Sequence, residues 1–402
     1  MTRLVTSESV TCGHPDKVCD QISDAILTQI LKNDKNARVA VETFVTSGLV
    51  SVMGEISTDY YVEIENIVRQ TLKKIGYNSS RVGFDYESCG VLVSIDSQSP
   101  DISQGVDQIK DIDHKRQAKS SLNYLGAGDQ GIMFGYANCE TDELFPLAPK
   151  IANELALQLV KVREEGTVEN LRPDGKTQIT LEYDGKKARA VKTVVISAQH
   201  NENVNEKTLK NEILKSVVRP VLDKYNFSKY NLDTSNFDFI FNPTGKFIIG
   251  GPRADTGLTG RKIIVDTYGG IAHHGGGAFS GKDPSKVDRS ASYALRWIAK
   301  NVVAADLAKE VELQVSYAIG IAEPVSLNID TFGTGLISDD KILQGVKKVF
   351  DLRPAAIIRD LDLLNVDYTQ TSVFGHFGRS DVSFSWEECN RVNELKDACR
   401  SF

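Results

Sequence analysis

The chain has 402 residues, 41% of them hydrophobic, and this length exceeds what one hydrophobic core usually organises. We therefore expect two or three domains. The formal net charge of −7 argues against a protein that binds nucleic acid or a membrane surface, so any anion site must be a local basic cluster.

The N-terminal residues and the spacing of the cysteines predict an ordinary intracellular protein. The first residues lack the apolar core of a signal peptide, and no hydrophobic run approaches the length that crosses a bilayer. Six scattered cysteines without a CxxC pair predict neither a disulfide framework nor a zinc site. We expect a cytoplasmic protein with reduced thiols and no membrane partner.

The first expected helix covers Lys17 to Leu31, because apolar residues recur there at helical spacing and Pro15 suits the first helical position. His14 and Asp16 then lie at a helix N-terminus, where free N–H groups and partial positive charge favour phosphate. An aspartate that merely caps the helix explains the same stretch equally well.

A β-hairpin follows, with strands at 39–45 and 49–56 separated by Ser47 and Gly48. With a two-residue turn, Glu42 faces Met53 and lies diagonal to Glu55, so both carboxylates share one face of the sheet. They either approach one pocket or are two exposed strand residues. The polar segment 97–122 comes next and is either an active-site lid or an interdomain linker.

Residues Gly126 to Gly131 fit the GxGxxG pattern of dinucleotide-binding proteins, which should open a helix. Ile132 to Tyr136 instead has the composition of a strand, so nicotinamide binding is disfavoured. Asp129 is better interpreted as a carboxylate in a tight turn, which either binds a ligand or caps the backbone.

Further helices are predicted at 147–163, 206–225, 286–307 and 340–351, with strand pairs within 178–197 and 313–329. Hairpins and helices alternate three times without the regularity of a parallel sheet. This order favours an α+β fold with three similar units.

Residues 246–289 form the local basic cluster, with seven basic and four acidic residues and ten of the 31 glycines. Within it, Gly276 to Asp283 matches a phosphate loop except that Asp283 replaces the magnesium-binding Ser or Thr. The preceding residues make a poor strand, so a true P-loop fold is disfavoured. A phosphate-binding loop with Lys282 and a simple tight turn both remain open. Asp16 and Asp288 are plausible hard-oxygen ligands of Mg²⁺.

Taken in order, several motifs resemble the signature blocks of the S-adenosylmethionine synthetases, and the resemblance covers the whole chain. They are GHPDK at 13–17, GAGDQG at 126–131, NPTG at 242–245, GLTGRK at 257–262, DTYGG at 266–270, GGGAFSGK at 275–282 and GHFGR at 375–379. The family implies three structurally similar α/β-sandwich domains in a pseudo-threefold arrangement, with mixed sheets packed against helices. Approximate boundaries are 1–108, 115–232 and 233–402, with the domains interleaved.

The resemblance also implies the reaction. The sulfur of L-methionine attacks C5′ of ATP and expels triphosphate, which is then hydrolysed to pyrophosphate and phosphate. A thioether is already nucleophilic, so positioning and stabilisation of the charged leaving group should dominate over general-base catalysis. We expect two Mg²⁺ ions per active site, one K⁺ per subunit, and a homodimer with active sites at the subunit interface, paired into a dimer of dimers.

Site residues are carried over position by position. The catalytic set implied by the resemblance is His14, Lys176, Arg261 and Lys282. Positions that match ATP contacts are His14, Asp174, Gly175, Lys176, Lys246, Phe247, Asp255, Arg261, Lys262, Ala278 and Lys282. Asp174, Gly175 and Lys176 are expected in a turn.

Positions that match methionine contacts are Glu55, Gln98, Asp129, Asp255 and Lys286, whereas Asp16 and Asp288 match magnesium ligands and Glu42 a potassium ligand. Residues 98–107 resemble the family's mobile loop. Two competing hypotheses are a nucleotide-sensing scaffold without activity and a nicotinamide oxidoreductase. The intact site positions disfavour the first and the strand after Gly131 disfavours the second.

Overall fold

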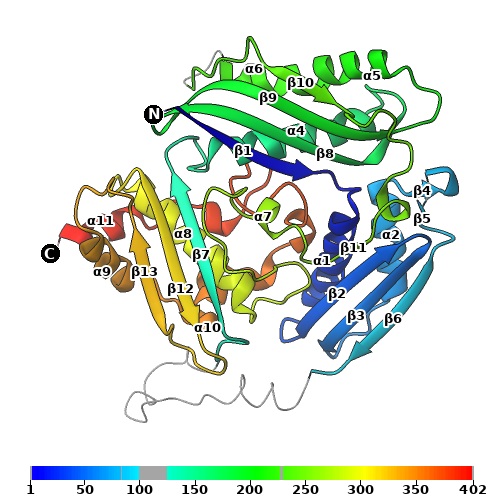
Figure 1. Cartoon of the computed structure of the whole chain (residues 1–402). Helices are drawn as coiled ribbons and strands as arrows, with labels where there is room; N and C mark the ends of the chain where they lie inside the picture. The colour runs from blue at the N-terminus through cyan, green and yellow to red at the C-terminus, as the bar shows by residue number, and fades with distance from the viewer. Residues whose placement is uncertain (1, 83, 99–124, 227–229, 401–402) are drawn as a thin grey trace.

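The computed structural model describes residues 2–82, 84–98, 125–226 and 230–400. Three sheets surround a group of central helices, so the fold is α+β as predicted (Figure 1). Within the described residues, none of the helices combines the length and hydrophobicity that crossing a lipid bilayer demands.

Each sheet is built on a hairpin. The hairpins are β2 (Arg38–Thr46) with β3 (Leu49–Ser57), β8 (Leu171–Asp184) with β9 (Lys187–His200), and β12 (Glu310–Tyr317) with β13 (Ser326–Asp330). In each sheet one further strand pairs antiparallel with the first strand of the hairpin: β11 (Gly257–Leu258) with β2, β1 (Thr2–Val10) with β8, and β7 (Gly131–Asn138) with β12. Two sheets gain a parallel fourth strand, β6 (Gly90–Asp96) beside β3 and β10 (Asp238–Phe241) beside β9.

The three units exchange their first strands in a closed cycle. Strand β1 precedes the first hairpin in the chain but joins the sheet of the second, β7 precedes the second but joins the third, and β11 precedes the third but joins the first. Because each unit therefore depends on a strand from another, the three parts interleave instead of following one another along the chain.

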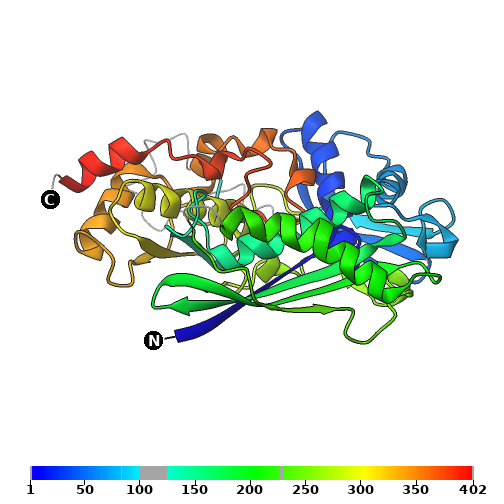
Figure 2. The ribbon, with the colours of Figure 1, turned by 90° about the horizontal axis from the view of Figure 1, so that it is seen from above.

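Long helices cover the inner faces of the sheets. Helix α1 (Pro15–Asn33) packs on β2 and on α2 (Ile64–Ile75), α4 (Leu147–Glu164) on β1 and β8, and α8 (Val287–Ala304) on β7 and β12. Among the described residues, the remaining α-helices are α5 (Glu206–Ile213), α6 (Arg219–Asn226), α7 (Ile263–Asp266), α9 (Asp339–Val349), α10 (Pro354–Asp360) and α11 (Val392–Arg400). A short strand pair joins β4 (Asn78–Ser79) to β5 (Phe84–Asp85). Seen from above, the helices of the second unit run along one face of its sheet (Figure 2).

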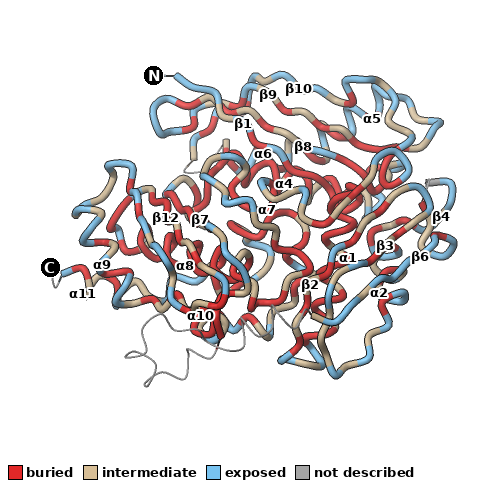
Figure 3. Tube along the Cα trace, turned by 60° about the horizontal axis from the view of Figure 1, so that its bottom comes forward, coloured by how far each residue is buried: buried red, intermediate tan, exposed pale blue. Residues whose placement is uncertain are grey.

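Burial is greatest where these helices meet (Figure 3). One apolar cluster joins the first and third units, through side chains such as Ile22 and Ile26 of α1 and Leu295 and Ile298 of α8. A separate cluster fills the second unit between α4, α5, α6 and its sheet. Each fully buried aliphatic side chain contributes about 1.5–3 kcal/mol, so these clusters fix the central helices that carry the polar residues described below.

Most predicted elements are confirmed, with two corrections. The expected single helix at 206–225 contains a π-helical stretch at Leu214–Val218. The α-helix that follows begins at Arg219, and its second residue, Pro220, lacks an N–H donor. The predicted turn at Asp174 to Lys176 is wrong, because these residues lie inside β8. There the register with β9 is irregular, and a Cβ on Gly175 would lie only 3.0 Å from the Ser197 carbonyl oxygen.

The two ambiguous glycine motifs also find structural explanations. Strand β7 begins at Gly131, as expected, so GAGDQG opens a strand and not a nucleotide-binding helix. Gly126 packs on Gly320, and Ala127 exchanges backbone hydrogen bonds with residues 320 and 321. In the other motif, Asp283 is buried and accepts the Val39 N–H at 2.7 Å, so it secures the backbone where a P-loop would place its magnesium ligand.

Candidate active site

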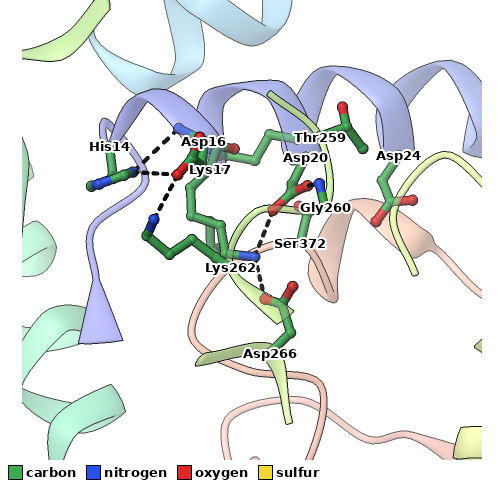
Figure 4. A network of polar contacts seen from close by, with 12 residues as sticks. His14, Asp16, Lys17, Asp20, Asp24, Thr259, Gly260, Lys262, Asp266 and Ser372 are labelled. Atoms are coloured by element: carbon green, nitrogen blue, oxygen red, sulfur yellow. Dashed lines mark hydrogen bonds and ion pairs between the residues drawn. The ribbon is translucent and has the colours of Figure 1, made fainter. Parts of the chain in front are cut away.

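The N-terminus of α1 is capped by His14, not by Asp16. The Asp16 N–H donates to His14 Nδ1 at 3.2 Å, and Pro15 occupies the first turn. Burial, with the positive charge of Lys262 next in size, lowers the pKa of His14 to about 3. His14 is therefore neutral, and because Nδ1 accepts a hydrogen bond, its proton is on Nε2. Figure 4 shows this nitrogen pointing away from Asp16.

Asp16 uses its carboxylate to organise a basic loop. Its Oδ1 accepts the Leu258 N–H at 3.1 Å, and its Oδ2 accepts Lys262 Nζ at 2.6 Å, with Arg261 Nε 3.8 Å away. Burial opposes the charge, but hydrogen bonds from Lys262 and Leu258 outweigh it and hold the pKa of Asp16 below its ordinary value. This carboxylate is ionised and already surrounded by cations.

Strand β8 brings Asp174 and Lys176 beside the same helix end, because Lys176 pairs with Val10 at the end of β1. Asp174 Oδ2 accepts the Gly251 N–H at 2.8 Å, whereas Oδ1 is buried without a hydrogen-bond partner in the described part of the chain. Burial raises the pKa of Asp174 to about 6. Such an orphaned oxygen is an acceptor in need of a donor.

The loop from 246 to 262 completes this first group. Phe247 exchanges backbone and side-chain hydrogen bonds with His200, with its N–H 3.2 Å from His200 Nε2. Asp255 and Lys246 are exposed, and the Asp255 carboxylate accepts the Thr256 N–H at 2.8 Å. Ala278 packs directly against Gly260, which places the glycine loop next to Arg261.

A second group surrounds the N-terminus of α8. Lys282 Nζ lies 2.6 Å from Asp288 Oδ2, and Lys286 Nζ lies 2.5 Å from the buried Asp283. A Cβ on Gly277 would lie 2.3 Å from Asp288 Oδ1, so only glycine lets the loop approach this carboxylate. Gly281 has a φ of +79°, and a Cβ there would meet the Val41 carbonyl.

A cavity of about 190 Å³ lies against this second group. Six predicted site residues line it: Glu55, Gln98, Asp129, Lys282, Lys286 and Asp288. Its described lining does not include His14, Asp16 or Lys262. The predicted site residues thus fall into two groups within one chain, the first at α1 and the second at α8.

Glu42 lies apart from the cavity lining. The hairpin register is as predicted, with Glu42 opposite Met53 and a two-residue turn between Thr46 and Leu49. Glu42 and Glu55 consequently share the exposed face of the sheet, and both side chains are exposed. The predicted mobile loop at 98–107 lies outside the described residues except for Gln98, whose N–H donates to Ser57 Oγ at 3.2 Å.

Sequence reasoning missed the buried acids that support both groups. Asp20 Oδ1 accepts the Gly260 N–H at 2.9 Å (Figure 4), and Asp24 Oδ1 accepts the Gly281 N–H at 2.9 Å. Lys17 lies between Asp20 and Asp266, bonding to both. Aspartates four residues apart on one helix face were the available signal, which the search for apolar periodicity passed over.

Comparisons with known proteins agree along the whole chain. Three family models match: the S-adenosylmethionine synthetase N-terminal domain at residues 2–100, the central domain at 124–247 and the C-terminal domain at 249–388. The S-adenosylmethionine synthase of Clostridium botulinum (strain Alaska E43 / Type E3) is 54% identical over 396 residues, covering 98% of this chain and 99% of that protein. That of Clostridium tetani (strain Massachusetts / E88) is 53% identical, covering 99% of this chain and all of that protein, and that of Bifidobacterium adolescentis is 55% identical, covering 99% of each.

Proposed function

This chain belongs to the S-adenosylmethionine synthetase family, and from that premise we propose how its two groups of residues join ATP to L-methionine. Its activity is that of a methionine adenosyltransferase, which forms S-adenosylmethionine. One observation carries the residue assignment. Both predicted magnesium ligands, Asp16 and Asp288, lie 2.6 Å from a predicted phosphate-binding lysine, Lys262 and Lys282 respectively.

The first group suits ATP. Lys176, Arg261 and Lys262 supply positive charge around the helix N-terminus, where free backbone N–H groups favour phosphate. The neutral His14 offers its Nε2–H to the bridging oxygen that leaves C5′, so it stabilises the departing charge without a proton transfer. The unpaired Oδ1 of Asp174 accepts a hydrogen bond from a substrate hydroxyl, and Lys246, Phe247, Asp255 and Ala278 complete this part of the site.

The second group suits methionine and the far end of the triphosphate. The carboxylates of Glu55 and Asp129 attract the ammonium group, which Asp255 of the first group also contacts. Gln98 bonds the substrate, and Lys286 attracts its carboxylate. Lys282 neutralises phosphate charge. The sulfur then displaces triphosphate at C5′, forming the C–S bond as the C–O bond breaks, and water hydrolyses the bound triphosphate to pyrophosphate and phosphate.

Magnesium fits these residues. No cluster of three or more acidic, histidine or cysteine side chains able to hold a metal occurs in the described ranges. Mg²⁺ usually takes one or two carboxylates together with phosphate oxygens and water, and Asp16 and Asp288 each offer a carboxylate beside a lysine assigned to phosphate. Asp16 and Asp288 would each hold one ion, and bound Mg²⁺ would supply charge neutralisation to the phosphates. Glu42, alone and exposed, remains the predicted K⁺ ligand.

We further propose that the complete site forms between two copies of the chain. Within one chain, most of the residues assigned to ATP gather at α1, whereas Lys282 and most of the residues assigned to methionine line the cavity at α8. A homodimer that places the first group of one copy against the second group of its partner contains two complete sites. Pairing of two dimers stays a prediction.

A mixing experiment tests this arrangement. We would produce Lys262→Ala and Lys282→Ala chains separately, each expected to be nearly inactive, and then unfold and refold them together. If sites form between copies, each mixed dimer contains one intact site, and activity returns to about a quarter of the parent value. If each chain holds its own complete site, the mixture stays as inactive as its components.

The basic activity has its own measurement. Purified protein is incubated with ATP, methionine, Mg²⁺ and K⁺, and S-adenosylmethionine, pyrophosphate and phosphate are followed by mass spectrometry and phosphorus NMR. Equal formation of all three, dependent on methionine, is the expected outcome. ATP binding without product would instead support the inactive scaffold.

A further inference from the structure

Helix α1 directs three aspartates to one face, because residues four apart lie nearly one turn apart. Each accepts a backbone N–H from a different point on the loops that follow: Leu258 on Asp16 at 3.1 Å, Gly260 on Asp20 at 2.9 Å and Gly281 on Asp24 at 2.9 Å. Figure 4 shows the three aspartates along α1 and the contact of Asp20 with Gly260.

The loops held in this way are the ones that carry the proposed triphosphate-binding cations. Gly260 immediately precedes Arg261 and Lys262, and Gly281 immediately precedes Lys282. A shift of either backbone amide therefore moves a cation that contacts the leaving group. The two loops are also in contact with each other, since Ala278 packs on Gly260.

Asp20 and Asp24 cannot touch substrate themselves, because both side chains are 0% exposed. Each is instead neutralised by an equally buried cation. Lys17 Nζ lies 3.0 Å from Asp20 Oδ2, and Arg289 forms two hydrogen bonds to Asp24 at 2.7 and 3.0 Å. Arg289 also donates to the carbonyl oxygens of Phe279 and Lys282, at 3.0 and 3.2 Å, so it fixes the glycine loop on both sides of Gly281.

Buried ion pairs are poor evidence of stabilisation, because the loss of hydration offsets most of their attraction. A buried carboxylate that accepts a backbone N–H does, however, fix that amide in distance and direction. We propose that Asp20 and Asp24 are positioning residues that hold the two cation-bearing loops against α1. The proposal rests on the assignment of Arg261, Lys262 and Lys282 to the triphosphate.

The test replaces each acid with its amide, Asp20→Asn and Asp24→Asn. An asparagine has one acceptor oxygen where Asp20 satisfies two donors, the Gly260 N–H and Lys17, so one of them must be lost. The chain offers a matched control in Glu387→Gln. Glu387 is also a buried carboxylate, bonded to Arg296, Lys300 and the Gly378 N–H, but it holds neither cation-bearing loop.

Turnover is measured with saturating ATP and methionine, at a temperature where circular dichroism shows each variant fully folded. Hydrolysis of inorganic tripolyphosphate alone is measured in parallel. We expect kcat to fall on the order of 10- to 100-fold in both reactions for the two aspartate variants, because a displacement near 1 Å can cost about 100-fold. The KM for methionine and the activity of Glu387→Gln should stay within about twofold of the parent. Aspartate variants that keep parental kcat, or a control that loses as much, would overturn the proposal.

Two additions keep the outcome interpretable. Lys262→Ala and Lys282→Ala are assayed alongside. If these two lysine variants retain parental turnover, the assignment of the site fails. If the lysine variants lose turnover but the aspartate variants keep it, the assignment stands and only the positioning role fails. Hydrogen–deuterium exchange of the parent protein requires no variant. Amides 260 and 281 should exchange as slowly as the core of α1, and exchange as fast as in exposed loops would contradict the proposal.

Discussion

Two sets of basic side chains lie close together in this protein and differ in burial. The side chains of Lys262, Lys282 and Lys286 are 19–27% exposed, whereas those of Lys17, Arg289 and Arg296 are completely buried. All six form ion pairs with carboxylates. The partners of Lys262 and Lys282 are the predicted magnesium ligands, while the buried cations pair with acids whose side chains are at most 8% exposed.

This difference in burial indicates that ion pairs between basic side chains and carboxylates serve two purposes in this protein. The pairs of Lys262 and Lys282 are exchangeable, since arriving phosphates and metal can take over both partners. The buried pairs are permanent, because breaking one leaves an uncompensated charge away from water. Removal of Lys262 or Lys282, which are partly exposed, should therefore reduce activity without unfolding the protein, whereas removal of a buried cation should lower the stability of the fold.

The largest expected effect comes from Arg289→Met. This change leaves Asp24 buried without its cation, which costs about 3–5 kcal/mol of unfolding free energy. Urea unfolding followed by circular dichroism measures the loss. The double variant Asp24→Leu/Arg289→Met removes both charges and should recover most of the stability. A single variant as stable as the parent would show that this pair is not one of the permanent contacts.

Next in size is the effect of Lys282→Ala on turnover. Loss of one preorganised charge at the leaving group should lower kcat about 100- to 1000-fold, while the thermal midpoint stays within about 2 °C. Lys161→Ala serves as the control, because Lys161 is exposed on α4 and its ion pair with Glu165 is long, at 3.9 Å. If turnover falls only in proportion to lost stability, Lys282 belongs with the buried set instead.

Local sequence patterns predicted much of this fold, since hairpin register and helix starts depend on neighbouring residues. The pairing of Glu42 with Met53 followed from the two-residue turn alone, and Pro15 located the start of α1. The exchange of β1, β7 and β11 between sheets could not be derived in this way. It depends on contacts between distant segments, which no local pattern encodes.

The candidate site was likewise predictable from the sequence only in part. Family motifs identified residues at both groups, but the basic segment 246–289 gave no sign that Arg289 is buried and Lys282 is partly exposed. Both are basic residues near glycines in the sequence. Their roles separate only when the partners are known: Lys282 pairs with the nearby Asp288, whereas Arg289 pairs with Asp24, 265 residues away in the sequence. Asp174 was misplaced for a similar reason, because its strand continues only through pairing with β9 and β1.

The smallest effect sharpens the comparison through pH. His376 is completely buried, donates or accepts a hydrogen bond with the Tyr293 hydroxyl at 2.7 Å, and lies 3.9 Å from Asp266. Burial, and then the charges of Arg289, Lys17 and Arg379, hold the pKa of His376 well below its ordinary value of 6.5.

The folded protein therefore keeps His376 neutral, whereas the unfolded chain binds a proton there below about pH 6.5. Because the unfolded state gains that proton, stability falls as pH decreases, by about 1.4 kcal/mol per pH unit for this one residue. His14 and His274 also have lowered pKa values, so the parent's total slope exceeds this share. Urea unfolding of the parent and of His376→Gln at pH 5 and pH 6 isolates the contribution of His376. Between these two pH values the variant should lose about 1.2 kcal/mol less stability than the parent, slightly below the limiting slope because the unfolded histidine is only partly protonated at pH 6. Equal slopes would mean that His376 is protonated within the core, and that the permanent buried cations do not exclude a further positive charge.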